Sequence, residues 1–258
     1  MKPKLDEFVK FANSLADNAS ETSMYYFRKK INIENKDDES PVTIADKKTE
    51  KIIRDQIRKT YPNHGILGEE YENENLDSEF IWVIDPIDGT RSYIAGHKDF
   101  GNLISLLHNN KPVIGIINCP AHDERWIGIE NTKTTCNGKE VKTSGIKKIE
   151  NSYLFTSGIY FHEPVFRNGF EILKEKSKYF RLGGDCYMYG MLSSGFIDIV
   201  IEDTLKAHDY MALINVVEGS GGKITDKYGK PITLQSDGSL IASSSIELQD
   251  EIIKIINN

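Results

Sequence analysis

The chain has 258 residues, of which 39% are hydrophobic and 28% charged, and its net charge is -7 at pH 7. These values are typical of a folded globular protein and exclude a disordered chain. An acidic chain with dispersed cations lacks the clustered positive charge on which nucleic-acid binding depends. No apolar run approaches the roughly 20 residues that span a bilayer, and the first ten residues form no apolar leader. We therefore expect a cytoplasmic protein with neither a membrane nor a nucleic-acid partner.

The first two elements are predicted to be helices. Apolar residues between positions 8 and 15 recur at the spacing of one helix face. Thr43, followed three residues later by Asp46, forms the pattern of a capping box and predicts that a second helix begins there. That helix is expected to end near Tyr61, which precedes a proline.

From residue 66 the pattern changes to short apolar runs separated by turn residues, which predicts a meander of strands. The runs lie at 66–67, 80–84, 101–107, 113–117 and 126–129. Asn137 and Gly138 then predict a tight hairpin, because both residues tolerate positive φ.

Beyond residue 148, strand-like and helix-like segments alternate, which is typical of an α/β arrangement. The segments lie at 153–156, 166–173, 186–192, 197–201 and 211–217. We predict an α/β protein with two packed subdomains. Residues 1–145 form an α+β subdomain with two helices and an antiparallel sheet, and residues 146–258 form an α/β subdomain.

The segment WVIDPIDGT at 82–90 carries the most chemical information. Asp85 and Asp88 follow a buried strand, Pro86 stiffens the turn, and Gly89 allows close approach of the backbone. Two such carboxylates are suitable ligands for a hard cation such as Mg²⁺. Taken alone, the pattern is equally typical of two acids that cap a turn and the next helix.

Two further acidic segments favour the metal site. Glu69 and Glu70 follow the strand at 66–67, and Asp209, next to His208, opens an apolar helix. Divalent ions about 3.5 to 4 Å apart, held by several carboxylates, typically promote in-line displacement at phosphorus. The ligands available in the sequence suit that reaction.

The motifs resemble those of the inositol monophosphatase family. They are GEE at 68–70, WVIDPIDGT at 82–90 and, after Asp209, EGSGG at 218–222. The resemblance covers nearly the whole chain and implies an inositol-monophosphatase-like αβαβα layered sandwich. Haloacid-dehalogenase phosphatases also carry two acids after a strand, but with one residue between them, whereas two residues separate Asp85 from Asp88 here. Direct attack of water on phosphorus is therefore expected, without a covalent aspartyl phosphate.

The resemblance also implies a metal site. Glu69, Asp85 and the Ile87 carbonyl match the ligands of one Mg²⁺ ion, and Asp85, Asp88 and Asp209 match those of a second. A third, weaker ion would depend on Glu69 through water. Two or three Mg²⁺ ions are thus expected in each active site.

Catalytic and substrate-binding roles follow from the same match. Asp46 and Thr90 correspond to the pair that orients the attacking water, and Glu69 completes the expected catalytic group. The role of Asp46 is compatible with the capping box. Phosphate is expected at the backbone N–H groups of Gly89 and Thr90, and Arg91 is either an added charge or an exposed side chain. The residues expected to contact the substrate are Asp88, Gly89, Thr90, Asp185, Glu202 and Asp209.

Two positions narrow the substrate. Inositol-specific members carry a small residue where this chain has Asp185, and Trp where it has His208, whereas GGDCY at 183–187 is similar to the histidinol-phosphatase branch. Histidinol phosphate carries a cation, which Asp185 and Glu202 would bind better than a neutral polyol. The alternative for Asp185, which follows two glycines, is a helix N-cap. His208 is left outside the catalytic set, because a histidine beside a metal ligand more often packs or supports it.

The sequence therefore predicts a Mg²⁺-dependent histidinol-phosphate phosphatase of histidine biosynthesis, in which a metal-activated water attacks phosphorus. Alternatives within the family are an inositol-1-phosphate phosphatase and a broad small-molecule phosphatase. An alternative of a different class is a cation-binding module without turnover, against which the intact pair of Asp46 and Thr90 argues. The resemblance also implies a homodimer.

Overall fold

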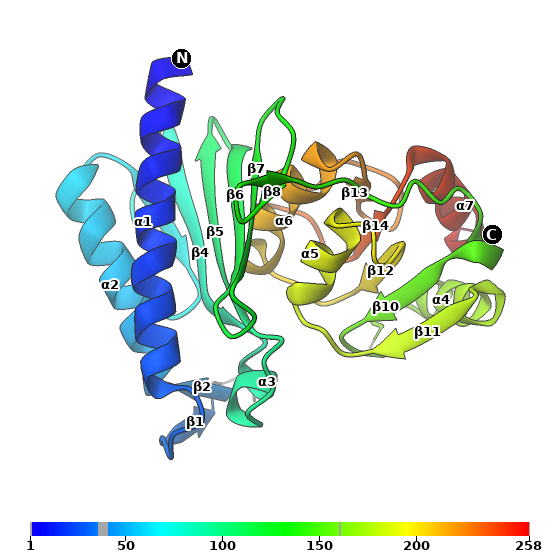
Figure 1. Cartoon of the computed structure of the whole chain (residues 1–258), viewed down its shortest axis with the longest axis horizontal. Helices are drawn as coiled ribbons and strands as arrows, with labels where there is room; N and C mark the ends of the chain where they lie inside the picture. Colours follow the sequence, from blue (N-terminus) through cyan, green and yellow to red (C-terminus); the bar gives the residue numbers. More distant parts are fainter. Residues whose placement is uncertain (1, 36–40, 160, 258) are drawn as a thin grey trace.

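The computed structural model of the chain describes residues 2–35, 41–159 and 161–257. Within these ranges the strands form a sheet of seven, a sheet of five and one two-stranded pair. Figure 1 shows the two large sheets facing each other across a layer of helices, with further helices on the outer side of each sheet. The layers follow the order α, β, α, β, α, which confirms the predicted layered sandwich.

The helices in the described ranges are α1 (Lys2–Tyr26), α2 (Ile44–Thr60), α3 (Thr90–Ile94), α4 (Pro164–Lys176), α5 (Tyr187–Ser193), α6 (Ala207–Gly219) and α7 (Ile246–Ile256), with a 3-10 turn at Ile149–Asn151. The capping box predicted for α2 is present, because Thr43 caps the helix and Asp46 bonds back to the Thr43 backbone. None of the described helices combines the length and the apolar character that crossing a bilayer requires.

The seven-stranded sheet has its strands in sequence order: β3 (Gly65–Gly68), β4 (Phe80–Asp88), β5 (Gly101–His108), β6 (Lys111–Cys119), β7 (Glu124–Ile129), β8 (Thr135–Cys136) and β9 (Lys139–Glu140). From β4 onward the neighbours pair antiparallel, and β8 and β9 form the hairpin predicted at Asn137 and Gly138.

The prediction of an antiparallel sheet is wrong at one edge, because β3 pairs parallel to β4. A parallel neighbour needs a connection that returns the chain to the starting end, and residues 69–79 supply it. Gly68 at the end of β3 lies opposite Ile84 of β4. The residues that follow these two positions, Glu69 and Asp85, therefore emerge at the same edge of the sheet.

The five-stranded sheet has the order β11 (Tyr179–Leu182), β10 (Tyr153–Thr156), β12 (Ile199–Glu202), β14 (Leu240–Ser243) and β13 (Lys223–Thr225). The strand β10 is parallel to both β11 and β12, whereas β14 is antiparallel to β12 and β13. The predicted segments at 153–156, 166–173, 186–192, 197–201 and 211–217 correspond to β10, α4, α5, β12 and α6. The sequence did not reveal β11, β13, β14 and α7. The two-stranded pair is β1 (Ile33–Asn35) with β2 (Pro41–Thr43).

Apolar clusters fill the space between the layers. Phe8 and Leu15 of α1 and Ile53 of α2 pack with Trp82 of β4 on the outer face of the seven-stranded sheet. Helices α4 and α7 cover the outer face of the other sheet. The middle layer, α5 and α6, packs between the sheets, and Trp126 of β7 belongs to the apolar cluster that these helices form.

Helix α6 lies very close to the seven-stranded sheet, although the helix belongs to the predicted second subdomain, which begins at residue 146, and the sheet to the first. A Cβ atom on Gly115 of β6 would lie only 2.1 Å from the Ala212 carbonyl oxygen of α6, so glycine is required at this contact. The close approach brings the first turn of α6, with Asp209, to the edge where β3 and β4 end. We retain the division of the chain near residue 145 as a proposal.

Candidate active site

The turn that contains Asp85 and Asp88 lies where β4 departs from regular pairing with β5. Asp85 pairs with Leu103 and Asp88 with Gly101, so the ladder is irregular between the two acids. Asp85 Oδ1 accepts a hydrogen bond from the Ile87 backbone N–H at 3.0 Å. This local bond closes the turn and fixes the direction of the Asp85 side chain.

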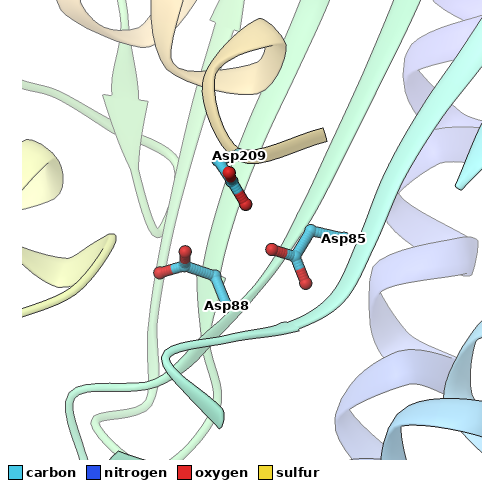
Figure 2. A group of neighbouring side chains, drawn as sticks. All are labelled: Asp85, Asp88 and Asp209. Carbon is cyan, nitrogen blue, oxygen red and sulfur yellow. The ribbon is translucent and has the colours of Figure 1, made fainter. Parts of the chain in front are cut away.

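Asp209 reaches the same point from the first turn of α6. Its Oδ2 atom accepts a hydrogen bond from the Lys206 backbone N–H at 2.6 Å. Figure 2 shows the side chains of Asp85, Asp88 and Asp209 converging from the strand end and the helix start. Among the described residues, these three form a group in which one carboxylate oxygen of each lies within 4.8 Å of the others.

Burial and neighbouring acids destabilise the charged forms of the three acids. Burial raises the pKa of Asp85 well above its usual value, and the charges of Glu69 and Asp88 raise it further. Burial likewise raises the pKa of Asp88. Burial also raises the pKa of Asp209. The charge of His208 opposes this rise, and His208 Nε2 lies 3.5 Å from Asp209 Oδ1. Oxygen ligands whose charges are held close together suit a divalent cation that takes hard ligands, so the residues present fit Mg²⁺.

Glu69 lies close to this group but outside it. Its charge contributes to the raised pKa of Asp46, Asp85 and Asp209. The acids within 4.8 Å of one another do not include it. The predicted convergence is thus observed for three acids, with Glu69 at their margin.

A buried ion pair of α2 holds the loop that carries Glu69. Arg54 Nε donates to Glu50 Oε1 at 2.6 Å, and both side chains are almost fully buried. Glu50 Oε2 accepts the Glu70 backbone N–H at 2.7 Å, and Arg54 donates to the carbonyl oxygens of Tyr71 and Glu72. This pair was not among the residues predicted to support the site. Its signal was an acid and a base four residues apart on the apolar face of the second helix.

Asp46 uses its two carboxylate oxygens for different partners. Oδ2 accepts hydrogen bonds from the backbone N–H and the hydroxyl of Thr43, at 2.8 and 2.6 Å. Oδ1 lies 3.3 Å from the hydroxyl oxygen of Thr90, which is also 3.1 Å from the Ile87 carbonyl oxygen. The predicted pair therefore meets, and capping α2 leaves Asp46 free to contact Thr90. Burial raises the pKa of Asp46, and its bonds from Thr43 oppose the rise.

Gly89 and Thr90 begin the short helix α3, directly after the acidic turn. Gly89 has a φ of +79°, which is strained for a side-chain-bearing residue. A Cβ atom at this position would also lie 2.7 Å from Asp185 Cγ. Arg91 is exposed on the surface.

Asp185 does not cap α5. The N-cap position is Cys186, and no side chain caps the helix there. Instead, Asp185 has a φ of +41°, and its Oδ2 accepts a hydrogen bond from Ser92 Oγ at 2.5 Å. The Cys186 backbone N–H donates to Asp88 Oδ2 at 2.6 Å. The 183–186 loop is therefore tied to the acidic turn at Asp88 and to helix α3 at Ser92.

Glu202, the last residue of β12, lies buried on the other side of the same space. Its Oε2 accepts a hydrogen bond from the Tyr189 hydroxyl at 2.6 Å, and its Oε1 accepts one from the Ser157 hydroxyl. Burial raises the pKa of Glu202 to about 7. A cavity of about 110 Å³ separates the acids, and its lining includes Asp88, Asp185, Cys186, Tyr189, Glu202 and Asp209.

No sequence pattern indicated Ser92 or Ser157 as parts of this site. Ser92 contacts a residue 93 positions away, and Ser157 contacts one 45 positions away. Single hydroxyl-bearing residues carry no spacing signal, so only the fold could reveal them.

Known proteins resemble this chain over nearly its whole length. The profile of the inositol monophosphatase family matches residues 4–258. The bifunctional phosphatase IMPL2 of Arabidopsis thaliana, named as chloroplastic, is 41% identical over 93% of this chain and 70% of its own. A histidinol-phosphatase of Chlorobaculum parvum is 30% identical over 92% of this chain and 93% of its own. The solved structure of an inositol monophosphatase from Zymomonas mobilis has a TM-score of 0.89, with 36% identity and 98% of both chains covered.

The acids cluster where the strand β4 ends and helix α6 begins. Together with the family match and the relatives, this site defines the protein as a metal-dependent phosphatase that hydrolyses small phosphomonoesters. The chain belongs to the inositol monophosphatase family. The resemblance expected from the motifs is confirmed, and its relatives include histidinol-phosphatases as well as inositol monophosphatases.

Proposed function

We propose that the protein is a Mg²⁺-dependent histidinol-phosphate phosphatase of histidine biosynthesis. The observation that carries the proposal is that two acids, Asp185 and Glu202, face the cavity beside the three-acid group. A buried acidic cavity favours a cationic leaving group over a neutral polyol. The histidinol-phosphatases among the relatives support this choice.

The metal ligands proposed from the family resemblance are Glu69, Asp85, the Ile87 carbonyl, Asp88 and Asp209. They would hold two or three Mg²⁺ ions. Bound there, Mg²⁺ would lower the pKa of water and stabilise the charge that develops on the phosphoryl oxygens. In its absence the three close acids repel one another, which agrees with the raised pKa values of Asp85 and Asp88.

Asp46 and Thr90 would orient the attacking water. A hydroxyl has a single proton, and donation to Asp46 Oδ1 leaves the Thr90 oxygen as an acceptor. That oxygen would then accept a hydrogen bond from the water and orient a lone pair of the water toward phosphorus. The hydrogen bonds from Thr43 keep Asp46 from turning away.

The substrate would lie between the turn and the 183–186 loop. The backbone N–H groups of Gly89 and Thr90 would bind phosphate oxygens as α3 begins. Asp185 and Glu202 would bind the cation of the leaving group. Because the pKa of Glu202 is about 7, this side chain gains its charge near neutral pH.

Inositol 1-phosphate is the second candidate substrate. It is favoured by the 36% identity to the Zymomonas mobilis inositol monophosphatase. Hydroxyl groups of a polyol would bond the same two acids with less electrostatic gain than a cation. A cytoplasmic location and a homodimer remain predictions, which imaging of a tagged chain and sedimentation analysis would test.

Phosphate release from L-histidinol phosphate, inositol 1-phosphate and 3'-phosphoadenylate, measured with Mg²⁺ and then with EDTA, tests the proposal. We expect release that EDTA abolishes and that is fastest with histidinol phosphate. A preference for inositol 1-phosphate would contradict the substrate assignment. Mg²⁺ binding without release from any of the three would favour the non-catalytic module instead.

A further inference from the structure

The side chain of Asn102, on β5, contacts the backbone of the turn between Asp85 and Asp88. Asn102 is fully buried, and its Nδ2 donates a hydrogen bond to the Pro86 carbonyl oxygen at 2.6 Å. The β4–β5 ladder is irregular between Asp85 and Asp88, so the sheet provides no regular pairing at Pro86. A buried carbonyl without a partner is strongly disfavoured. The Asn102 amide therefore provides the hydrogen bond at the position where the ladder is interrupted.

The orientation of the Asn102 amide is set by a chain of hydrogen bonds. Asn118 of β6 donates from Nδ2 to Asn102 Oδ1 at 2.7 Å, and Arg125 of β7 donates from Nε to Asn118 Oδ1 at 2.8 Å. A guanidinium only donates, and a carbonyl only accepts. With a pure donor at one end and the Pro86 carbonyl at the other, each amide has one possible orientation.

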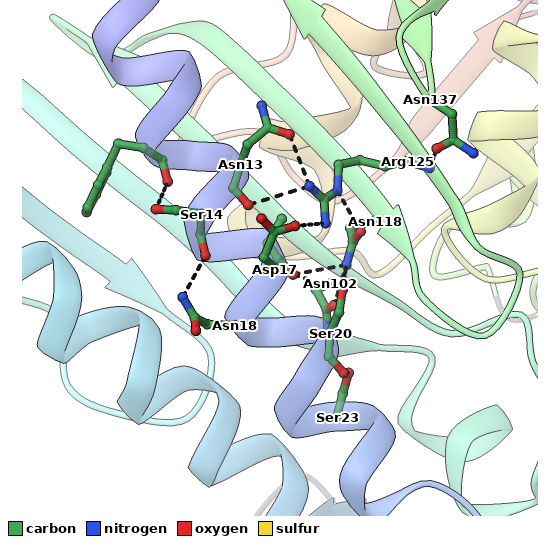
Figure 3. Close-up of polar contacts among 12 residues, drawn as sticks. Asn13, Ser14, Asp17, Asn18, Ser20, Ser23, Asn102, Asn118, Arg125 and Asn137 are labelled. Carbon is green, nitrogen blue, oxygen red and sulfur yellow. Dashed lines mark hydrogen bonds and ion pairs between the residues drawn. The ribbon is translucent and has the colours of Figure 1, made fainter.

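The far end of this chain is anchored on α1. Arg125 donates to Asn13 Oδ1 at 3.0 Å and to Asp17 Oδ1 at 2.7 Å, and Asn118 Nδ2 also donates to Ser20 Oγ at 2.8 Å. Figure 3 shows these contacts running from helix α1 across the sheet to Asn102. The network therefore joins a long helix to the acidic turn.

The chain continues through the turn to a proposed metal ligand. The Pro86 carbonyl and the Ile87 N–H belong to one peptide group, and that N–H donates to Asp85 Oδ1 at 3.0 Å. A peptide whose oxygen accepts a hydrogen bond is a stronger donor at its nitrogen. The order of groups is Arg125, Asn118, Asn102, Pro86, Ile87 and Asp85.

We propose that Asn102 is a positioning residue for the metal centre. Through the Pro86–Ile87 peptide it orients the Asp85 carboxylate, while Asn118 and Arg125 fix its own orientation. This inference rests on the proposed metal site. The network lies on the face of the seven-stranded sheet that packs against α1, opposite the substrate cavity.

The test is calorimetric titration of Mg²⁺ into metal-free protein, which does not depend on turnover. Asn102→Leu keeps the volume of the side chain and removes the amide. We expect its dissociation constant for Mg²⁺ to rise about 10- to 100-fold, the range found when partners of metal ligands are removed. At saturating Mg²⁺, kcat should fall while KM for the substrate changes little.

Ser105→Ala is the matched control. Ser105 is also fully buried on β5, and its hydroxyl donates to the Ile114 carbonyl oxygen at 2.9 Å, away from the turn. This variant should lose thermal stability as Asn102→Leu does but bind Mg²⁺ as the wild type does. Should Asn102→Leu fail to fold, Arg125→Met, at a partly exposed position, should raise the dissociation constant by about threefold or more through the same network.

Wild-type affinity for Mg²⁺ in a folded Asn102→Leu variant, or in Arg125→Met if Asn102→Leu does not fold, would overturn the positioning role while leaving the proposed function intact. Absence of Mg²⁺ binding in the wild-type protein would overturn the proposed function, and the positioning role with it. The two failures are therefore distinguishable in one series of titrations.

Discussion

The hydroxyl oxygen of Thr90 lies 3.3 Å from Asp46 Oδ1, although the two residues are 44 positions apart. The other oxygen of Asp46 is held by Thr43 in the capping box of α2. One carboxylate thus fixes the start of a helix and the direction of a hydroxyl beside the acidic turn. The structural and the catalytic interpretations of Asp46 are therefore compatible with each other.

Replacing Asp46 by Asn should separate these two roles. The Asn oxygen can still accept from Thr43, so we expect a loss of stability of about 1 kcal/mol or less. The amide NH₂ that replaces Oδ1 cannot accept the hydrogen bond from Thr90, so kcat should fall about 10²- to 10⁴-fold. Steady-state kinetics and thermal melts measure the two effects. Ser245→Ala, which removes the N-cap of α7 from Leu248, is the control and should lower stability alone. A kcat that also survives in Asp46→Asn would refute the catalytic role.

The metal-free protein should become more stable when Asp85 is replaced by Asn. The pKa of Asp85 is raised by burial and by neighbouring acids, so the folded state holds a proton there more tightly than the unfolded state does. This contribution to stability is complete below about pH 4 and is lost as pH rises through the raised value. At pH 7, where the wild type holds a destabilised carboxylate at this position, the Asn variant should therefore be the more stable of the two.

Thermal melts with EDTA and with Mg²⁺ measure this prediction. Mg²⁺ should raise the melting temperature of the wild type and have little effect on Asp85→Asn. Asp55→Asn removes an acid from an exposed pair with Lys51 and should leave the response to Mg²⁺ unchanged. If the wild type had as high a melting temperature in EDTA as in Mg²⁺, the acids would not be the metal site.

Asp185→Asn should affect the two candidate substrates differently. Loss of a charged hydrogen-bond partner corresponds to about 1.5 to 3 kcal/mol, or roughly 10- to 100-fold in KM for histidinol phosphate. The KM for inositol 1-phosphate should change far less. Ser92→Ala, which removes the hydroxyl bonded to Asp185, should give a smaller change in the same direction. Equal effects on both substrates would contradict a role in cation recognition.

The pH dependence of KM should report on Glu202. Its pKa is raised to about 7, so the carboxylate forms as pH rises from 6 to 8 and KM for the cationic substrate should fall over that range. Phosphate and imidazole also titrate near pH 6 to 6.5, but they do so equally with every enzyme variant. The comparison with Glu202→Gln isolates the side chain.

Glu202 should also make protein stability depend on pH. Rising pH should strengthen substrate binding through Glu202 but lower the stability of the folded state. Because the folded pKa is raised, the stabilising contribution of protonated Glu202 is present below about pH 4.5 and is lost as pH rises through about 7. Metal-free Glu202→Gln should therefore lose less stability between pH 5 and 8 than the wild type does. Parallel stability curves for the two proteins would contradict the raised pKa.

Local patterns predicted much of the fold. The capping box at Thr43, the hairpin at Asn137 and Gly138, and the acids after the strand that ends in the 82–90 motif all depend on residues close in sequence. The parallel pairing of β3 with β4 did not follow from the sequence, because a short apolar run does not define the direction of its partner.

The sequence motifs predicted those parts of the site that lie within the motifs themselves. Asp85, Asp88 and Asp209 converge as expected, since each follows or opens a strongly apolar element. Ser92, Asn102 and the ion pair of α2 were not foreseen. Each acts through a contact made by the tertiary fold, and no spacing in the sequence indicates a contact of that kind.

The most direct test of the account compares L-histidinol phosphate with its analogue that lacks the amino group, 3-(imidazol-4-yl)propyl phosphate. We predict that kcat/KM for histidinol phosphate is higher by about 10- to 100-fold, as expected for a charged hydrogen bond. The ratio should fall toward one in Asp185→Asn combined with Glu202→Gln. Equal values of kcat/KM for the two compounds with the wild-type enzyme would contradict recognition of a cationic leaving group by these acids.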